Sequence, residues 1–121
     1  MRALGRRFLA IQANLISIEP IPRILQETLD GLGRLDILVN NAGIYHPGRI
    51  EDGPLDQVQR QFLVNQFGTY LGMRHAAAPM RAAGGGAIVN ISSIAGQVGF
   101  PGAAAYVGSK WAVRGMTKTA A

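Results

Sequence analysis

The chain has 121 residues, a net charge of +5 and no cysteine; 48% of its residues are hydrophobic and 16% are charged. This balance predicts a folded domain or part of one, residues 1–121, and excludes an intrinsically disordered chain. Without cysteine there is no disulfide framework and no thiolate metal site, which fits a reducing compartment. We therefore expect a cytoplasmic protein without a metal site.

The positive charge is spread along the chain and does not predict a nucleic-acid partner. Only Lys110, Arg114 and Lys118 share a helical face, and no aromatic residues interleave with them for base stacking. No uninterrupted apolar stretch approaches the length that spans a bilayer. We expect neither nucleic acid nor a membrane as a partner.

The first third of the chain predicts a strand and then a helix. Residues 8–11 (FLAI) are a short apolar run that ends in a polar turn, as a buried strand does. Apolar residues then recur at helical spacing from residue 21 to residue 32. Gly31 or Gly33 is expected to end this helix.

The rest of the chain continues the alternation. Continuous hydrophobicity from Ile37 and again over residues 87–91 predicts two parallel strands covered on both faces. Residues 54–81 predict a long helix with a bend before Pro79, and residues 103–121 predict the last helix. The order β-α-β-α-β-α predicts an α/β fold with a parallel sheet and helices on both of its faces.

Polar and small residues gather where the predicted strands end. The sequence NNAG occupies residues 40–43, and NISS occupies residues 90–93. Ligands of open α/β sheets bind at the carboxyl ends of the strands. Ala42 and Gly43 have almost no side chain, so a flat ligand could lie directly on the backbone there.

Each of these signals also has a plainer explanation when it is taken alone. Asparagine favours turns, and Ser92 and Ser93 could be turn or cap residues. Asn65 could be a core amide with satisfied hydrogen bonds. Tyr106 and Lys110 could be a core aromatic beside a solvated lysine on one amphipathic helix.

Together, the motifs DILVNNAG, mid-helix Asn65, AIVNISS and YVGSK resemble the short-chain dehydrogenase/reductase family, in this order from about Phe8 onward. The resemblance implies a Rossmann-like, three-layer fold and NAD or NADP as the cofactor. The catalytic residues that it implies are Asn65, Ser93, Tyr106 and Lys110. The cofactor-binding residues that it implies are Asn14, Leu15, Asn41, Ala42, Gly43, Tyr106 and Lys110. Ser93 is preferred to Ser92 because the family places its serine thirteen residues before the tyrosine.

The chemistry explains why these residue types would be used. A phenol with an ordinary pKa near 10 is a poor base at neutral pH. Lys110, four residues after Tyr106, lies on the same helical face, and its ammonium can stabilise a phenolate. Ser93 would donate to the substrate oxygen, and Asn65 would hold a water that links Lys110 to solvent. Small residues at 108 and 109 are expected to let this helix pack tightly.

Parts of the family pattern have no counterpart in the chain. The Gly-rich phosphate-binding turn, the strand whose end distinguishes NAD from NADP, and the later strands and substrate loop are all missing from the sequence. The chain therefore resembles a central fragment of such a domain, with an incomplete sheet. We expect this chain alone to be marginally stable and to bind the cofactor weakly.

The resemblance implies an oxidoreductase that interconverts a secondary alcohol and a ketone. The first third of the chain resembles sugar-acid dehydrogenases, and residues 81–115 resemble hydroxysteroid-type members. Homo-oligomerisation through the long helices is also implied. The alternative is a non-catalytic α/β remnant that acts only as an oligomerising module.

Overall fold

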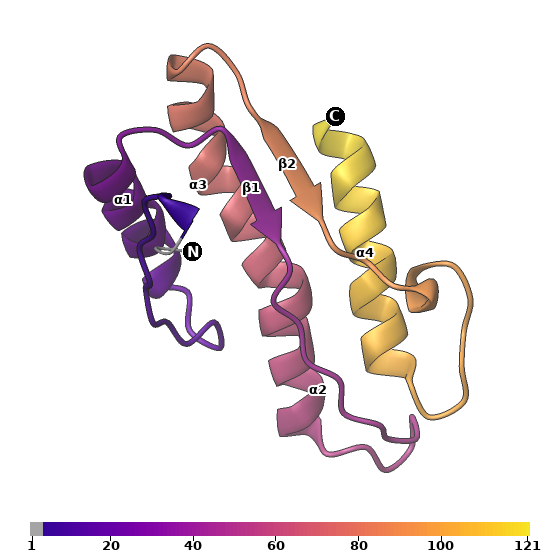
Figure 1. Ribbon diagram of the computed structural model, residues 1–121. Helices are drawn as coiled ribbons and strands as arrows, with labels where there is room; N and C mark the ends of the chain where they lie inside the picture. Colours follow the sequence, from indigo (N-terminus) through magenta and orange to yellow (C-terminus); the bar gives the residue numbers. More distant parts are fainter. Residues whose placement is uncertain (1–3) are drawn as a thin grey trace.

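The computed structural model describes residues 4–121, which fold into helices on one side of a short parallel sheet (Figure 1). The elements, in chain order, are α1 (Pro20–Leu32), β1 (Ile37–Asn40), α2 (Leu55–Gln61), α3 (Gly68–Ala82), β2 (Ala87–Asn90) and α4 (Ala104–Ala120). A π-helical segment, Phe62–Phe67, joins α2 to α3, and a 3₁₀ turn, Ile94–Gly96, lies between β2 and α4.

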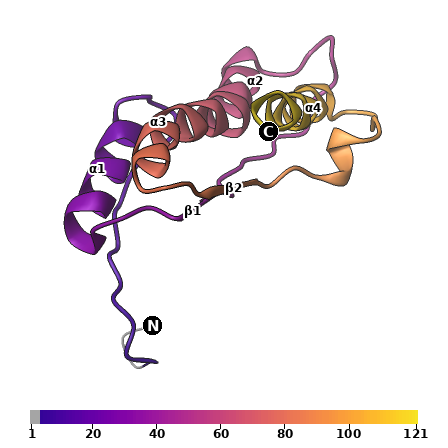
Figure 2. The same cartoon turned by 90° about the horizontal axis from the view of Figure 1, so that it is seen from above.

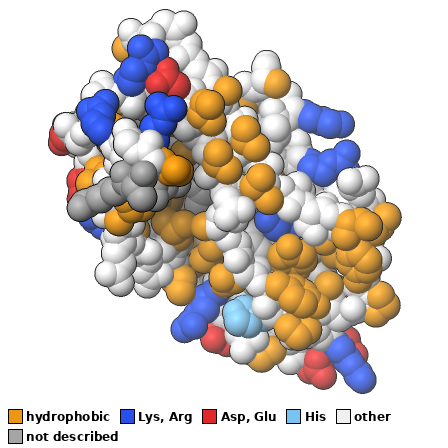
Figure 3. All heavy atoms as spheres, viewed as in Figure 1, with side chains coloured by type: hydrophobic (Ala, Val, Ile, Leu, Met, Phe, Trp, Pro, Cys, Tyr) orange, Lys and Arg blue, Asp and Glu red, His pale blue; other side chains and the backbone are white. Residues whose placement is uncertain are grey.

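The two strands form the expected parallel pair, with Ile37 opposite Ala87 and Asn40 opposite Asn90. The helices lie together on one face of this sheet (Figure 2). The exposed side chains of the strands are apolar and include Ile37, Val39 and Val89; Ile91, directly after β2, is also exposed. Figure 3 shows apolar side chains across the open face. The Rossmann-like α/β class with an incomplete parallel sheet is therefore confirmed. Helices were expected on both faces of the sheet, whereas the helices of residues 4–121 cover one face only.

The helix expected over residues 21–32 is confirmed as α1, and it packs against α3. Leu25 and Leu35 form a buried core cluster with Ala76 and Met80 of α3. Proline at the start of α1 suits the first turn of a helix. Gly33 ends the helix in the left-handed conformation (φ 92°), and its N–H donates back into the last turn.

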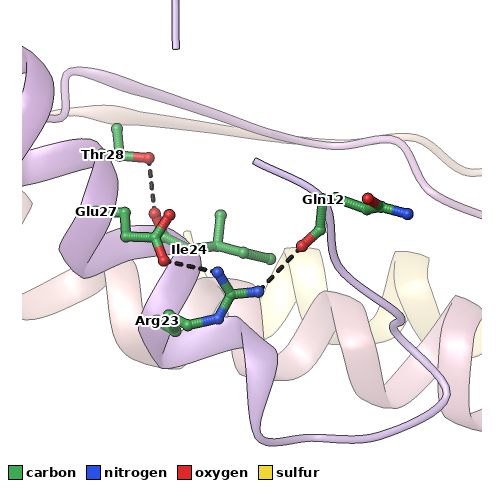
Figure 4. Close-up of polar contacts among 5 residues, drawn as sticks. All are labelled: Gln12, Arg23, Ile24, Glu27 and Thr28. Carbon is green, nitrogen blue, oxygen red and sulfur yellow. Dashed lines mark hydrogen bonds and ion pairs between the residues drawn. The ribbon is translucent and has the colours of Figure 1, made fainter. Parts of the chain in front are cut away.

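The strand expected over residues 8–11 is wrong. Residues 6–14 have no strand pairing and run beside α1. The guanidinium of Arg23 donates to the carbonyl of Gln12 at 3.0 Å and to the carboxylate of Glu27 at 2.6 Å (Figure 4). An apolar run becomes a strand only where a neighbouring strand satisfies its backbone N–H and C=O groups, and in the described residues neither β1 nor β2 pairs with this run.

The long helix expected over residues 54–81 is present as α2, the π-helical segment and α3 in succession. A bend was expected before Pro79, but the change in helical geometry lies further toward the N-terminus. α3 continues through Pro79 to Ala82, whereas the hydrogen-bonding pattern changes to π-helical over Phe62–Phe67. Such π segments inside helices often occur at functional sites. The segment contains Asn65, whose position in the candidate site depends on it.

Candidate active site

The candidate site lies where β1 and β2 end and α4 begins (Figure 1). At the last register position the side-chain amide of Asn40 donates to the side-chain oxygen of Asn90 at 2.8 Å, and the amide of Asn90 donates to Thr117 of α4 at 3.0 Å. These bonds tie both strand ends to α4. Asn41, Ala42 and Gly43 follow β1 and are exposed, as a surface that receives a ligand must be.

Tyr106 and Lys110 lie on the same face of α4, as their spacing predicts. The ammonium of Lys110 is 5.8 Å from the centroid of the Tyr106 ring. Lys110 is only 4% exposed, and its ammonium donates to the carbonyl of Ile91 at 2.9 Å. Burial lowers the pKa of Lys110 below its usual value, because desolvation disfavours the charged form.

Each polar atom of the Asn65 side chain has a hydrogen-bond partner inside the protein, and its oxygen keeps a second lone pair. Its side-chain oxygen accepts from the N–H of Ile44, and its NH₂ group donates to the carbonyl of Ile44, both at 2.8 Å. The NH₂ group also donates to the hydroxyl of Ser109 at 3.1 Å. A Cβ added at Gly43 would lie 3.4 Å from the Asn65 oxygen and 3.5 Å from the Lys110 ammonium. Gly43 therefore leaves open a small polar space beside both groups.

The two serines after β2 have different partners. Ser92 donates to the carbonyl of Lys110 at 3.1 Å, and a Cβ at Gly96 would collide with its hydroxyl. Ser93 caps the 3₁₀ turn by accepting from the N–H of Ala95 at 3.2 Å. The hydroxyl proton of Ser93 is not used by that bond, so Ser93 can still donate to a ligand. The preference for Ser93 over Ser92 stays a prediction.

Asn14 and Leu15 lie apart from these groups. They belong to the segment before α1, on the opposite side of α3 from α4 (Figures 1 and 2). The side-chain oxygen of Asn14 accepts from the N–H of Ile16 at 3.1 Å, within its own turn. Their expected contact with a cofactor stays a prediction.

Sequence reasoning missed two buried polar residues, Gln61 and Ser109. Gln61 is 1% exposed, accepts from the N–H of His46 at 3.1 Å and donates to the carbonyl of His46 at 3.2 Å. Gln61 lies four residues before Asn65, so the two side chains share a helical face, and this spacing could have indicated that both are buried together. Ser109 is fully buried and donates to the carbonyl of Tyr106 at 2.7 Å.

The small residues at 108 and 109 have different roles. Burial of Ser109 agrees with the expected tight packing of α4. The expectation is wrong for Gly108, which is exposed and where a Cβ would come no closer than 3.7 Å to the ring of Phe62.

Other features of the described residues add no chemistry to this site. A cavity of about 280 Å³ between residues 46–50 and α2 contains none of the four residues expected to be catalytic. Within residues 4–121, no cluster of three or more His, Asp or Glu side chains could hold a metal ion. None of the helices in that range combines the length and apolar composition required to cross a bilayer.

Comparison with known proteins identifies relatives of this chain. The sequence profile described as short chain dehydrogenase matches residues 1–121. Trans-4-hydroxycyclohexanecarboxylate dehydrogenase of Sinomonas cyclohexanicum is 50% identical over 93 residues, which are 77% of this chain and 36% of that protein. The 3-alpha-(or 20-beta)-hydroxysteroid dehydrogenase of Mycobacterium bovis is 49% identical over 89 residues, which are 74% of this chain and 34% of that protein.

A solved structure extends the similarity to the fold. A short-chain dehydrogenase from Streptomyces avermitilis superimposes with a TM-score of 0.89 and 33% identity over 98% of this chain and 43% of its own. The chain thus spans about a third of the length of the curated relatives it matches. With a profile match over every residue and this structural similarity, the chain belongs to the short-chain dehydrogenase family.

Proposed function

We propose that these residues form the catalytic part of an NAD- or NADP-dependent oxidoreductase that interconverts a secondary alcohol and a ketone. The observation that carries this proposal is the buried Lys110 ammonium, held by the carbonyl of Ile91 beside the Tyr106 ring. An isolated buried ammonium is costly, so a lysine kept in this position needs a reason beyond stability. Stabilising a phenolate on Tyr106 supplies that reason.

Tyr106 would exchange a proton with the substrate oxygen, acting as the general base in oxidation and as the general acid in reduction. Lys110 would stabilise its phenolate form. Ser93 would donate a hydrogen bond to the same substrate oxygen and stabilise the charge that develops there. Asn65, beside Gly43, would hold a water that passes the proton between Lys110 and solvent.

The residues after β1 fit a nicotinamide cofactor. Asn41, Ala42 and Gly43 are exposed, and Gly43 lies beside the Lys110 ammonium without a side chain in between. A flat ring could lie on this backbone within reach of Lys110 and Tyr106. When bound, the nicotinamide would accept or donate the hydride. Asn14 and Leu15 would contact its adenine end only if the segment before α1 moves toward β1.

The names of the relatives indicate an alcohol as the class of substrate. One relative is named for a hydroxysteroid and another for a hydroxylated cyclohexane ring. We propose hydroxysteroid-type and sugar-acid-type alcohols as the candidate substrates. A cytoplasmic location is part of the same proposal.

Exposed aromatic side chains on the helices support homo-oligomerisation. Phe62, Phe67 and Tyr70 are exposed on the π segment and α3, and Trp111 is 49% exposed on α4. Burying large aromatic side chains against a second copy would stabilise a dimer. The same surface supports the second candidate function, a non-catalytic module that only associates.

A turnover assay decides between the two candidates. The purified chain, with millimolar NAD or NADP and a panel of secondary alcohols, is expected to produce reduced cofactor. The Tyr106→Phe variant is expected to lose this activity while it keeps its circular dichroism spectrum. Turnover that survives this substitution would refute the mechanism, and a wild-type chain that associates without any turnover would favour the non-catalytic module.

A further inference from the structure

We propose that Arg114 is a positioning residue that, through the carbonyl of Gly96, holds the turn carrying Ser93 in a fixed place on α4. The same helix carries Tyr106 and Lys110. This role rests on the proposed function, in which Ser93 donates to the substrate oxygen, and it adds a residue to the four that are expected to be catalytic.

The 3₁₀ turn Ile94–Gly96 has little to hold it by itself. Such turns have poorer hydrogen-bond geometry than an α-helix and occur only in short pieces. The largest side chain of this turn, Ile94, is 67% exposed, so it adds little apolar burial. Ser93 directly precedes the turn, and its hydroxyl oxygen accepts from the N–H of Ala95 at 3.2 Å. The position of the Ser93 hydroxyl therefore depends on where the turn lies.

The chain just before the turn is bound to α4 at a single residue, Lys110. The ammonium of Lys110 donates to the carbonyl of Ile91 at 2.9 Å, and the hydroxyl of Ser92 donates to the carbonyl of Lys110 at 3.1 Å. Both bonds lie on the N-terminal side of Ser93. Neither bond reaches the far end of the turn.

Arg114 binds that far end. Its Nη1 group donates to the carbonyl of Gly96 at 2.6 Å. Gly96 is buried, and a buried carbonyl needs a hydrogen-bond partner. Because the donor carries a positive charge, this bond is about twice as strong as one between neutral groups. The turn is thus attached to α4 at both of its ends.

The stem of Arg114 fits against Gly96 because that residue has no side chain. A Cβ at Gly96 would lie 2.9 Å from the carbonyl oxygen of Lys110 and 3.1 Å from Cδ of Arg114. The guanidinium also lies 5.7 Å from the centroid of the Trp111 ring, a distance typical of a cation–π contact. These contacts define the conformation of Arg114 before any ligand is present.

The two attachment points on α4 are one helical turn apart. Lys110 and Arg114 are four residues apart and share a face, and Tyr106 lies one turn earlier on that face. Catalytic groups must be held within about 0.5 Å of the productive geometry. Loss of Arg114 would loosen the Ser93 hydroxyl relative to Tyr106, and so weaken stabilisation of the transition state more than binding of the substrate.

Amide hydrogen exchange of the full chain, followed by NMR, tests the attachment without any turnover. Arg114→Met removes the donor and is expected to speed exchange at the N–H groups of Ala95 and Gly96 by at least about tenfold. Lys118→Met removes a positive charge at an exposed position of α4 and should leave both rates unchanged. Unchanged exchange in Arg114→Met would overturn the proposal.

Turnover tests the role in the reaction, with circular dichroism to verify that each variant is folded. Arg114→Met is expected to lower kcat about tenfold and to change KM by less than about twofold. Arg114→Lys keeps a charged donor and should recover most of the lost rate. An effect on KM alone, or a rate equal to that of the wild type, would contradict a positioning role.

A double substitution separates positioning from a general loss of stability. In a Ser93→Ala chain there is no hydroxyl to position, so adding Arg114→Met should lower kcat by less than about a further twofold. A further tenfold loss would mean that Arg114 acts independently of Ser93, against the proposal. Absence of turnover in the wild type would refute the proposed function alone, and hydrogen exchange would still decide whether Arg114 holds the turn.

Discussion

Two irregular segments of this chain, residues 44–48 after β1 and residues 6–14 before α1, are held in opposite ways. In the first segment, the backbone of Ile44 and His46 is paired with the buried amides of Asn65 and Gln61. In the second, exposed arginines make the polar contacts to α1, as Arg23 does with the carbonyl of Gln12 (Figure 4).

Buried hydrogen bonds fix a loop in place and so allow it to form part of a site. Breaking a buried hydrogen bond leaves a polar group unpaired and costs about 1–3 kcal/mol, so the segment next to Tyr106 has one strongly favoured conformation. The segment before α1 is held by exposed hydrogen bonds from Arg7 to the carbonyl of Leu32 and from Arg23 to the carbonyl of Gln12. Water competes for exposed bonds of this kind, so the segment is held only weakly.

Removing the Tyr106 hydroxyl, next to residues 44–48, is expected to change the catalytic rate more than any other substitution changes a measured property. Tyr106→Phe removes the hydroxyl that exchanges a proton with the substrate, and general acid–base catalysis contributes about a hundredfold to ten-thousandfold in rate. We expect turnover to fall by at least about a hundredfold, measured as formation of reduced cofactor. The matched control is Tyr70→Phe, which removes an exposed hydroxyl on α3; equal rates in the two variants would contradict the assignment.

The next effect is on stability. Asn65→Leu has a similar volume but leaves the N–H and the carbonyl of Ile44 without partners, so the free energy of unfolding should fall by about 2–4 kcal/mol. Urea unfolding followed by circular dichroism measures this. Gln66→Leu, one residue further along the π segment and only partly buried, should change it by less than about 0.5 kcal/mol. A similar loss in both variants would show that the amide pairing does not hold the segment.

Lys110 provides a smaller effect that depends on pH. Burial lowers its pKa below the ordinary 10.5, so between the lowered pKa and 10.5 the unfolded chain binds more protons than the folded chain does. The free energy of unfolding contributed by this group therefore rises with pH across that window, and below the window the full cost of the buried charge is present.

Lys110→Met should remove this rise. At neutral pH the variant is expected to be as stable as the wild type or more stable by up to about 1 kcal/mol, while turnover is lost. Thermal unfolding across the pH range above neutrality measures the slope. Lys118→Met, at an exposed position of the same helix, should keep the wild-type slope. An unchanged slope in Lys110→Met would show that burial of Lys110 is not its source.

Substitutions that affect residues 6–14 are expected to change the free energy of unfolding least. Arg23→Gln removes contacts of a half-exposed side chain, so the free energy of unfolding should fall by no more than about 1 kcal/mol. Limited proteolysis within residues 6–14 should become faster, while residues 44–48 stay protected. Arg60→Gln, an exposed position on α2, is the control. Equal acceleration in both segments would mean that they are not held independently.

Much of the fold could be predicted from local patterns in the sequence. The helical spacing of residues 21–32 predicted α1, and continuous apolar runs predicted β1 and β2. The interval of four residues was enough to place Tyr106 and Lys110 on one face of α4, because helical geometry depends only on the chain itself.

Residues 8–11 show where such patterns fail. Their apolar run has the composition of a strand, but a strand needs a second strand to satisfy its backbone, and no sequence pattern says which neighbour will be present. The π segment was missed for a related reason, since nothing in the order FLVNQF distinguishes it from an ordinary helix.

The sequence was therefore enough to predict the helices, the two paired strands and the shared helical face of Tyr106 and Lys110. The pairing of Gln61 and Asn65 with the backbone on both sides of Tyr45 depends on how the chain packs in three dimensions. Only the tertiary structure showed that Lys110 is buried against the carbonyl of Ile91. The physical reason is the distance along the chain between interacting residues. Helical spacing relates residues one turn apart, whereas a buried polar group can find its hydrogen-bond partner on a segment that is far away in the sequence.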